Sequence, residues 1–303
     1  MKKIAVTTSS FAKNDPMPIV MLRKNGFQVV LNEFGRKLSK EETLALCKGC
    51  AGIVAGTESY DKELLTKLAG LKVISRCGVG MENVDLSAAR ELGIQVFNTP
   101  SGPTLAVAEL TVALMLDLLR KVSEMDRGIR AGKWNKKMGS LLSGKRIGII
   151  GFGRIGRKVA ELLKGFGCEI SYTDIAAKDA ILGFKNVPME KLLESSDIIS
   201  IHISSGDEII NAQRLKLMKK GAFIINMSRG DVIDEDALFQ ALKNGYLGGA
   251  GLDVFRTEPY IGPLKKLENV ILTPHIGSYA MESRIGMEIE AVENLLKGLK
   301  GEI

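Results

Sequence analysis

Cysteine and proline are scarce in this chain of 303 residues, which has four cysteines and eight prolines. Few prolines, together with 45% apolar and 25% charged residues, indicate a globular protein and exclude a fibrous or disordered one. Cys47 and Cys50 have the CxxC spacing of zinc and redox motifs, but no second Cys or Cys/His pair completes a tetrahedral site. We therefore expect no metal site and four reduced thiols.

The sequence also has no apolar run long enough for a membrane span and no signal-peptide pattern. Met1-Lys2-Lys3 leads directly into Ile4-Ala5-Val6, without an apolar core or a small-residue cleavage site. The net charge is +7, but the basic residues are scattered among acidic neighbours and form no block. We expect a cytoplasmic protein with an anionic cofactor and an anionic substrate, and with no nucleic-acid and no membrane partner.

Short β-branched runs that alternate with helical patterns are the main feature of what is present. A chain of this length is expected to form two domains, and strand-helix alternation implies parallel sheets of the α/β class. Ser39 and Glu42 predict a capping box at the start of one helix. The first set of predicted strands is 4–7, 29–31, 53–55, 73–75 and 94–97.

A long helical stretch, 104–130, separates this set from a second one. It is followed by the polar run 132–144, which contains Trp134 and which we interpret as the crossover between the domains. The last helical segment, 281–299, has no strand left beside it in the second set, so we expect it to return to the first domain. The second set has six predicted strands: 146–150, 169–173, 197–203, 222–226, 249–253 and 270–272.

A glycine-rich run follows the first strand of the second set. Gly151-Phe152-Gly153-Arg154-Ile155-Gly156 leads into a predicted helix, 157–163. In a dinucleotide site Gly151 permits the tight turn, Gly153 lets backbone N–H groups approach a pyrophosphate, and Gly156 lets the helix pack on the strand. Asp174 ends the next strand, where a carboxylate binds the adenosine ribose and repels a 2′-phosphate, so NAD is favoured over NADP. The alternative is an ordinary glycine-rich turn.

Three candidate catalytic residues follow later strands of the same set. Arg229, in Ser228-Arg229-Gly230, lies where a guanidinium can hold a carboxylate through two parallel hydrogen bonds. His275 can exchange the hydroxyl proton, and Glu258 can hydrogen-bond to that imidazole and fix its tautomer. We also predict a helix over 231–244. A solvated arginine and a structural histidine are the alternatives, and the trio together favours catalysis.

The ordered set of motifs resembles the D-2-hydroxyacid dehydrogenase family, particularly its D-3-phosphoglycerate dehydrogenase branch, over nearly the whole chain. Residues 76–85, RCGVGMENVD, resemble the substrate loop of the family, and Val107-Ala108-Glu109 resembles its signature at the start of the interdomain helix. The resemblance implies that Arg229, Glu258 and His275 are catalytic. It also implies that Arg76 and the backbone donors of Gly78, Val79 and Gly80 bind the substrate.

The resemblance further implies two Rossmann-like or flavodoxin-like parallel-sheet domains, the second a doubly wound dinucleotide-binding sheet inserted in the first. We predict a substrate-binding domain at 1–98 plus 280–303, an NAD-binding domain at 99–279, and a homodimer built largely from the NAD-binding domains. Besides the glycine run, the residues implied to border the cofactor are Arg154, Ile155, Asp174, His202, Met227, Ser228, Asp253, Gly277 and Ser278.

Two departures from the family concern its pockets. The loop after His202 lacks the usual Pro-Leu-Thr and is about three residues shorter before Asn211, which puts the adenosine side of the pocket in question. Glu58 follows the third strand where phosphoglycerate dehydrogenases carry a basic residue. An acid there would repel a phosphate, although Arg76 or Lys133 could supply the missing cation. The chain also ends without a regulatory domain, so feedback by serine is not expected.

The sequence therefore predicts an NAD-dependent oxidoreductase that interconverts a small D-2-hydroxy acid and its 2-oxo acid, similar to phosphoglycerate dehydrogenase or to hydroxypyruvate and glyoxylate reductases. An NAD-sensing, corepressor-like protein without turnover is the alternative from another class, and oxidation of phosphite ranks below the hydroxy acids. Cys77 lies within the substrate loop, where it is either a reactive thiol that substrate protects or a buried, inert one.

Overall fold

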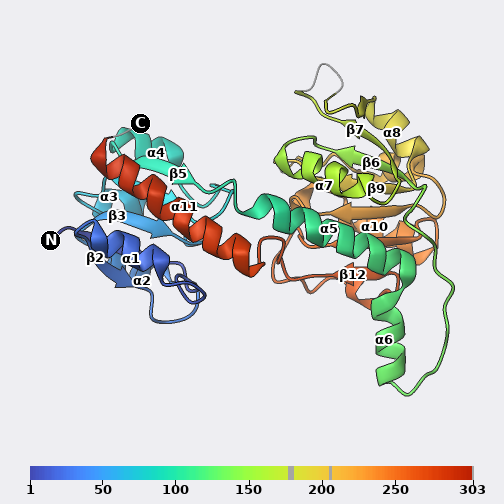
Figure 1. Ribbon diagram of the computed structural model, residues 1–303, viewed down its shortest axis with the longest axis horizontal. Coiled ribbons are helices and arrows are strands. Elements are labelled where there is room, and N and C mark those ends of the chain that lie inside the picture. The colour runs from blue at the N-terminus through green and yellow to red at the C-terminus, as the bar shows by residue number, and fades with distance from the viewer. Residues whose placement is uncertain (177–180, 205–206, 302–303) are drawn as a thin grey trace. The chain divides into compact units, whose positions relative to one another are not determined.

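The computed structural model describes residues 1–176, 181–204 and 207–301 and divides into two compact units (Figure 1). Unit 1 consists of Met1–Pro103 and Ser278–Ile303, and unit 2 is the continuous segment Thr104–Gly277. Unit 2 is therefore inserted in unit 1. The divisions fall at 103/104 and 277/278, whereas the sequence predicts them at 98/99 and 279/280.

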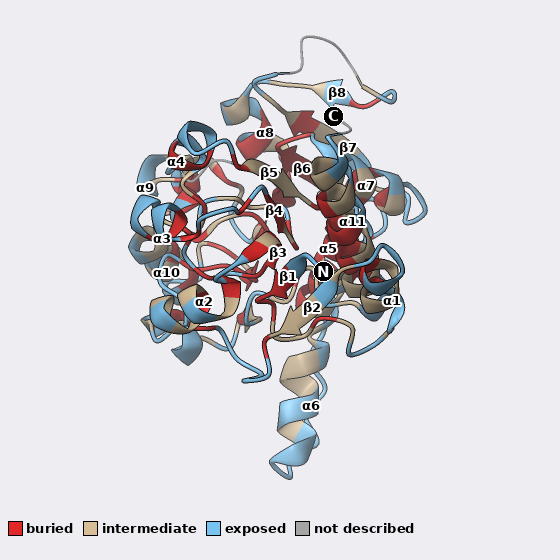
Figure 2. Cartoon of the chain, turned by 90° about the vertical axis from the view of Figure 1, so that its left-hand side faces the viewer, coloured by how far each residue is buried: buried red, intermediate tan, exposed pale blue. Residues whose placement is uncertain are grey.

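Unit 1 contains a five-stranded parallel sheet in the order β2-β1-β3-β4-β5. One face packs Ile4 and Val54 against α1 and α11, and the other packs Ile53 and Ile74 against α2, α3 and α4. Because both faces are covered, the central strands β1, β3 and β4 are apolar and largely buried, whereas the edge strands β2 and β5 are half-buried (Figure 2). All five predicted strands are found: β1 (Lys3–Val6), β2 (Gln28–Leu31), β3 (Cys50–Ala55), β4 (Val73–Arg76) and β5 (Gln95–Asn98).

The helices of unit 1 are specified by capping residues at their first turn and by the apolar residues that they bury against the sheet. The capping box is confirmed at α2, because Ser39 Oγ accepts the Glu42 N–H at 3.2 Å and Glu42 Oε2 accepts the Ser39 N–H at 2.8 Å. The last helix buries Met287, Ala291 and Leu295 against β3, β4 and β5. The bounds are α1 (Met17–Lys24), α2 (Lys40–Cys47), α3 (Lys62–Lys67), α4 (Leu86–Glu91) and α11 (Met281–Lys300).

Unit 2 contains a seven-stranded parallel sheet in the order β12-β11-β10-β9-β6-β7-β8. The sequence predicts six of these strands and misses β8, a polar pair of residues that adds to the edge beside Ser171 and Tyr172. The order reverses between β6 and β9, which makes this the switch point where doubly wound sheets bind ligands. The strands are β6 (Arg146–Ile150), β7 (Glu169–Thr173), β8 (Lys185–Asn186), β9 (Ile198–Ile201), β10 (Phe223–Asn226), β11 (Gly249–Leu252) and β12 (Val270–Leu272).

The predicted helix 104–130 is two helices, α5 (Pro103–Arg120) and α6 (Val122–Arg130). Lys121 between them has a left-handed backbone, with φ 56° and ψ 37°. The Asp117 carboxylate stabilises this break by accepting the Ser123 N–H at 2.7 Å and the Ser123 hydroxyl. The polar run 132–144 is not the crossover that was predicted, because it lies within unit 2 and joins α6 to β6.

Helices α5 and α7 cover one face of the unit 2 sheet, and α8, α9 and α10 cover the other. The helix predicted over 231–244 begins later, at Glu235, because Asp234 is its N-cap and residues 230–232 form a 3₁₀ turn. In the described part of the chain, no helix combines the length and apolar character needed to cross a membrane. The bounds are α7 (Arg154–Lys164), α8 (Met189–Ser195), α9 (Ala212–Leu217), η1 (Gly230–Val232), α10 (Glu235–Lys243) and η2 (Pro263–Lys266).

Candidate active site

Three adjacent strands of unit 2 carry the three candidate catalytic residues. Arg229 follows β10, Glu258 follows β11 and His275 follows β12, and these strands are neighbours in the sheet. Because the strands are parallel, their carboxyl ends meet at one edge, which is also the edge of the glycine-rich turn after β6. The fold therefore gathers side chains that are up to 46 residues apart in sequence, from 229 to 275, at one edge.

His275 and Glu258 form the ion-pair geometry expected of a proton-transfer pair. The distance from His275 Nδ1 to Glu258 Oε2 is 2.9 Å, and the two side chains are 54% and 38% exposed. The second carboxylate oxygen of Glu258 accepts the Phe255 N–H at 3.1 Å, so the acid is held by its own loop. Because Nδ1 faces the acid, Nε2 is left to exchange a proton with a substrate.

Asp253 holds the turn that carries His275. Its carboxylate accepts hydrogen bonds from Thr273 Oγ1 at 2.6 Å, from Ile276 N at 2.8 Å and from Gly277 N at 2.8 Å. His275 itself has a positive φ of 54°, an uncommon conformation for a non-glycine residue that these bonds on both sides support. Asp253 is 2% exposed. The structure thus gives this residue a role in placing His275, beside the cofactor contact that the family resemblance implies.

Arg229 lies in a short extended turn between β10 and η1 and is half-buried. Its Nη1 donates to Ser228 O at 2.9 Å, and the planar guanidinium presents further donors in the fork that matches a carboxylate. The turn is bound by the side chain of Asn226, which no sequence motif identifies as a site residue. The only signal for it was its place at the end of a predicted buried strand.

The glycine-rich turn has the close backbone approaches that a dinucleotide site requires. Gly151 has φ 88°, and a Cβ atom there would lie 2.6 Å from His202 O; a Cβ on Gly156 would lie 2.2 Å from Gly151 O. Gly153 is the N-cap of α7, and no atom lies within 4 Å of the position that a Cβ atom on it would occupy. A pyrophosphate can therefore approach the N-terminus of α7, where backbone N–H groups and the helix dipole favour anions.

Asp174 stands beside this turn. Its Oδ2 accepts the Phe152 N–H at 2.6 Å and its Oδ1 accepts the Ala176 N–H at 2.8 Å, which fixes the half-buried carboxylate at the end of β7. A carboxylate so placed fits a ribose diol and opposes a 2′-phosphate. The donor set of the turn, the open space at Gly153 and this acid together fit NAD. Of the other predicted cofactor residues, Arg154 and Ile155 lie in the first turn of α7, and Met227, Ser228, Gly277 and Ser278 lie after β10 and β12.

His202 follows β9 and lies beneath the glycine turn, with its carbonyl facing Gly151. Its Nε2 is 2.8 Å from Ser200 Oγ, and the ring is buried. Burial lowers the pKa of His202 to about 3 from its usual 6.5, so the ring is neutral in the folded protein. The shortened loop that follows includes Ser205 and Gly206, which lie outside the described residues, so the predicted change at the adenosine side stays a prediction.

The neutral His202 makes folding stability depend on pH. In the unfolded chain His202 is protonated below about pH 6.5, whereas in the folded protein it stays neutral down to about pH 3. The folded state is therefore most stable above pH 6.5, and its free energy of unfolding falls as the pH drops from 6.5 toward 3. We expect the free energy of unfolding to fall by about 1.4 kcal/mol between pH 7.5 and 5.5 from this group alone. Urea unfolding of His202→Gln should lack that increment, and His275→Gln should keep it. An equal pH response in the wild type and His202→Gln would contradict the assignment.

The predicted substrate loop lies in unit 1. The Gly78 N–H donates to Thr99 Oγ1 at 2.7 Å and to Arg76 O at 3.0 Å, and its predicted role as a donor to substrate stays a prediction. Among the described atoms, no partner accepts the N–H groups of Val79 and Gly80, which remain available as donors. The guanidinium of Arg76 lies over Gly78 and donates to Cys77 O at 2.8 Å. The substrate contacts of Arg76, Gly78, Val79 and Gly80 therefore stay predictions.

Glu58 is buried at the carboxyl edge of the unit 1 sheet, and 3% of it is exposed. Its Oε2 accepts the hydroxyl of Thr7 at 2.7 Å, and Thr7 Oγ1 is also 2.8 Å from the hydroxyl of Tyr60. Asn83, within the substrate loop, donates to the carbonyl oxygens of Gly56 and Glu58. This network fixes an acid at the edge where the Arg76 loop also begins.

Cys77 is a buried thiol, and 5% of it is exposed. Burial raises the pKa of Cys77 to about 11, which leaves almost no thiolate at neutral pH. We therefore expect a disulfide reagent such as DTNB to leave activity intact on the time scale in which unfolded protein reacts completely. Because Cys168 is partly exposed, the variant Cys168→Ser is the matched control. Rapid inactivation of that variant, slowed by substrate, would restore the reactive alternative.

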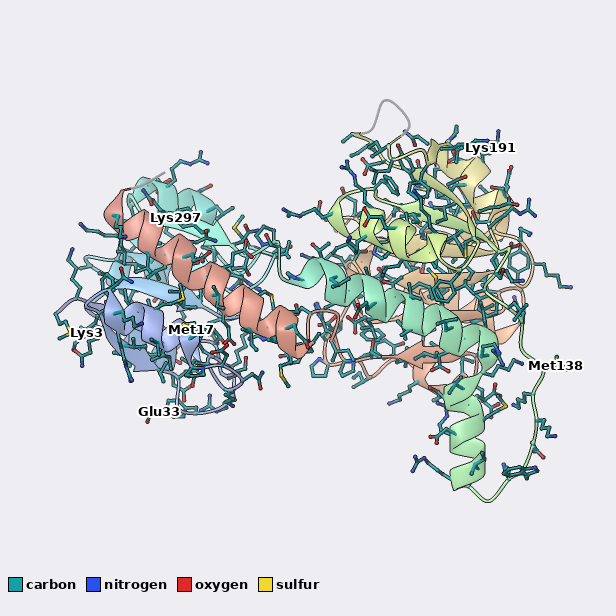
Figure 3. All side chains as sticks on the ribbon, viewed as in Figure 1. Lys3, Met17, Glu33, Met138, Lys191 and Lys297 are labelled. Carbon is teal, nitrogen blue, oxygen red and sulfur yellow. The ribbon has the colours of Figure 1, made fainter. Side chains whose placement is uncertain are left out.

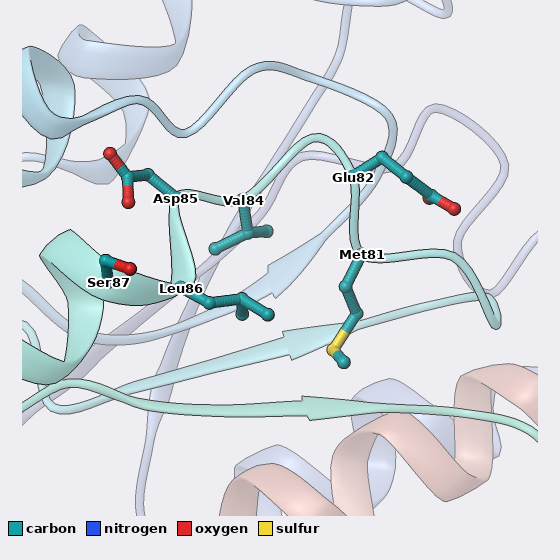
Figure 4. Close-up of a pocket in the computed structure, with 6 residues that line it drawn as sticks. All are labelled: Met81, Glu82, Val84, Asp85, Leu86 and Ser87. Atoms are coloured by element: carbon teal, nitrogen blue, oxygen red, sulfur yellow. The ribbon is translucent and has the colours of Figure 1, made fainter. Parts of the chain in front are cut away.

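A hollow of about 500 Å³ lies at the end of the substrate loop and the start of α4 (Figure 4). It is lined by Met81, Glu82, Val84, Asp85, Leu86 and Ser87. Glu82 and Asp85 contribute carboxylates, and no cationic side chain is among its six lining residues. Asp85 also caps α4 by accepting the Ala88 N–H at 2.9 Å. Because an anionic substrate needs a cation or backbone donors, this hollow does not fit one.

Cys47 and Cys50 are free thiols in the core of unit 1, and burial raises the pKa of both.

Comparison with known proteins gives one consistent result. Residues 112–277 match the family model described as D-isomer specific 2-hydroxyacid dehydrogenase, NAD binding domain. The chain is 44% identical over 263 residues to glyoxylate reductase of Thermococcus litoralis, covering 82% of this chain and 80% of that protein. It is 38% identical over 292 residues to D-3-phosphoglycerate dehydrogenase of Archaeoglobus fulgidus, covering 92% of this chain and 55% of that one. A glyoxylate reductase structure from Paecilomyes thermophila superposes with a TM-score of 0.86 at 31% identity, covering 100% and 97% of the two chains.

Proposed function

This chain belongs to the D-isomer-specific 2-hydroxyacid dehydrogenase family, and we propose that Arg229, Glu258 and His275 are its catalytic residues and that an unphosphorylated 2-oxo acid is its substrate. The protein is an NAD-dependent oxidoreductase that interconverts a small D-2-hydroxy acid and its 2-oxo acid. The alternative, a coenzyme-sensing protein without turnover, is not favoured, because the relatives carry the names of enzymes. The observation that carries the residue assignment is the His275–Glu258 pair at the edge where the Arg229 turn and the glycine turn also lie.

The coenzyme supplies or accepts a hydride at C2 of the substrate. The fork of Arg229 binds the substrate carboxylate and polarises the neighbouring carbonyl, so the reacting carbon is held in one orientation. In the direction of reduction, Nε2 of His275 gives a proton to the carbonyl oxygen; in oxidation it takes the hydroxyl proton. Glu258 stabilises the charged imidazole through Nδ1 and keeps the ring turned toward the substrate. In unit 1, the N–H groups of Gly78, Val79 and Gly80 and the side chain of Arg76 are proposed as groups that bind the substrate.

Glyoxylate and hydroxypyruvate are the proposed substrates in preference to phosphohydroxypyruvate. Several relatives at 40–44% identity over at least 82% of the chain are named glyoxylate reductase. Glu58, buried with its carboxylate bound to Thr7, places an acid at the substrate-loop edge of unit 1. A fixed negative charge there disfavours a doubly charged phosphate, and a short uncharged 2-substituent meets no such repulsion.

A homodimer that works in the cytoplasm is also proposed. No residue of α6 is buried, and the helix extends from the end of α5 away from the sheet of unit 2 (Figure 1). Exposed apolar side chains that gather in one patch mark protein–protein interfaces, and we propose such a patch on α6 and the loop after it. Figure 3 labels Met138 on the loop that follows α6. The exposed apolar residues of α6 and this loop are Val122 (57% exposed), Ile129 (56%), Trp134 (81%), Met138 (92%) and Leu141 (69%). Four free thiols agree with a reducing compartment.

The substrate proposal is tested by steady-state NADH oxidation with glyoxylate, hydroxypyruvate, pyruvate, longer 2-oxo acids and phosphohydroxypyruvate. We expect the highest kcat/KM with glyoxylate or hydroxypyruvate, and a value for phosphohydroxypyruvate at least about 10-fold lower, the ratio produced by one charge repulsion of about 1.4 kcal/mol. Chiral analysis of the product from hydroxypyruvate should give the D-acid. The variant Glu58→Gln should raise the relative rate with phosphohydroxypyruvate. A preference of the wild type for the phosphorylated acid would overturn the substrate proposal and leave the catalytic assignment standing.

A further inference from the structure

The side chain of Asn226 makes three hydrogen bonds to Ser228 and to Arg229, the proposed carboxylate-binding arginine. It is the last residue of β10, lies opposite Ile201 of β9 and Leu252 of β11, and is 1% exposed. Its Oδ1 accepts the Ser228 N–H at 3.1 Å and the Ser228 hydroxyl at 2.8 Å, and its Nδ2 donates to Arg229 O at 2.8 Å. The side-chain amide therefore closes a ring with the turn that follows it.

The orientation of this amide is fixed by the backbone. The Ser228 N–H can only donate, so the amide oxygen must face it, and the Arg229 carbonyl can only accept, so the NH₂ group must face that. At neutral charge the asparagine amide offers an acceptor and a donor side by side in one plane, which matches the Ser228 N–H and the Arg229 carbonyl. A buried aspartate at this position would present an oxygen to the carbonyl oxygen of Arg229.

The opposite side of the same turn is closed by a backbone contact. A Cβ atom on Gly230 would lie 1.8 Å from the carbonyl carbon of Phe255 and 2.2 Å from Arg256 N. Phe255 donates its N–H to Glu258, so this contact joins the Arg229 turn to the loop of the catalytic acid. The backbone of Arg229 is thus held between the Asn226 amide and residues 255–256.

We propose that Asn226 is a positioning residue that sets the direction of the Arg229 guanidinium toward the His275–Glu258 pair. It does so through the turn and does not itself touch the substrate. The inference rests on the proposed carboxylate-binding role of Arg229 and adds to it a residue whose own chemistry is not part of the reaction. Loss of the amide leaves the Arg229 side chain in place but changes the orientation of its guanidinium, which weakens the bidentate hydrogen bonds to the substrate carboxylate.

The first test compares Asn226→Asp and Asn226→Ala with the wild type. We expect kcat/KM for glyoxylate to fall about 100-fold, mainly through KM, a loss typical of a misdirected bidentate pair, while KM for NADH changes by less than about 3-fold. In Asn226→Asp the buried carboxyl can donate to the Arg229 carbonyl once protonated. The ratio of Asn226→Asp to wild-type kcat/KM should therefore rise between pH 8 and pH 5.5, whereas the ratio for Asn226→Ala should stay flat. Asn269→Asp, the same change just before β12 at the opposite edge of the sheet, is the control and should stay close to wild type.

The second test separates this inference from the proposed role of Arg229. In an Arg229→Lys background the fork is absent, so adding Asn226→Ala should lower kcat/KM by less than about 5-fold in place of about 100-fold, as expected for coupled residues. Equal losses in both backgrounds, or wild-type kcat/KM in both Asn226 variants, would overturn the role of Asn226. Near-normal activity of Arg229→Lys with full activity of Arg229→Gln would instead overturn the role of Arg229. Asn226→Asp conserves side-chain volume and keeps the test valid if Asn226→Ala does not fold.

Discussion

Replacement of His275 by alanine is expected to lower kcat for 2-oxo acid reduction by about 10³-fold or more, within the range that general acid–base catalysis contributes. The substitution removes the only group of the proposed trio that exchanges a proton with the substrate, and the proton must then come from water. NADH binding should persist, because the glycine turn and Asp174 do not depend on the imidazole. Stopped-flow or steady-state NADH oxidation measures the first effect, and fluorescence titration of NADH measures the second.

The control for His275 is its partner. Glu258→Gln keeps a hydrogen-bond acceptor near Nδ1 but removes the charge that stabilises the imidazolium, so its kcat should fall less, by about 10- to 100-fold. A His275→Ala enzyme that turns over at a rate near that of the wild type, with NADH bound normally, would show that the proton comes from another group.

Replacement of Arg229 by glutamine is expected to lower kcat/KM by about 10³-fold. Two charge-assisted hydrogen bonds to a carboxylate contribute about 1.5–3 kcal/mol each, and about 1.4 kcal/mol corresponds to a factor of ten. Both kinetic constants should change: KM rises because the ground-state carboxylate loses its partner, and kcat falls because the carbonyl is no longer held beside the proton donor. The measurement is a full kinetic analysis with glyoxylate at fixed, saturating NADH.

Arg256 is the matched control for Arg229. It lies after β11 at the same edge, but its guanidinium is directed to Glu208 at 3.3 Å and Asp231 at 3.7 Å, both exposed pairs. Surface pairs of this kind contribute little, so Arg256→Gln should keep kcat/KM within about 3-fold. Equal losses of activity in Arg229→Gln and Arg256→Gln would mean that only the total positive charge at the carboxyl edge of the unit 2 sheet matters. That result would refute a specific hydrogen-bonded pair between Arg229 and the substrate carboxylate.

Much of the fold could be predicted from sequence because its signals are local. The β-branched runs give eleven of the twelve strands, and the two-residue β8 is missed because Lys185 and Asn186 have no apolar pattern. The break at Lys121 was missed for a related reason. It depends on the Asp117 side chain bonding residues further along the chain, and the helical periodicity of the flanking residues continues across it.

The candidate site shows the same limit more clearly. The motifs identify Arg229, Glu258 and His275, but they do not reveal that the Gly78 N–H is already bonded to Thr99 or that Cys77 is buried. Asn226 and the structural contacts of Asp253 escaped for a physical reason. Both act through hydrogen bonds to backbone atoms, whose positions follow only from the assembled loops.

The continuity of unit 2 has a consequence for how such an enzyme can change. Every residue assigned here to proton transfer, carboxylate binding and coenzyme binding, except Val79, Gly80, Arg76 and Ser278, is encoded between Thr104 and Gly277. One continuous stretch of the gene therefore encodes nearly all of these residues. Recombination of the flanking sequence could then supply a new preference among acids while the inherited hydride chemistry passed on unaltered.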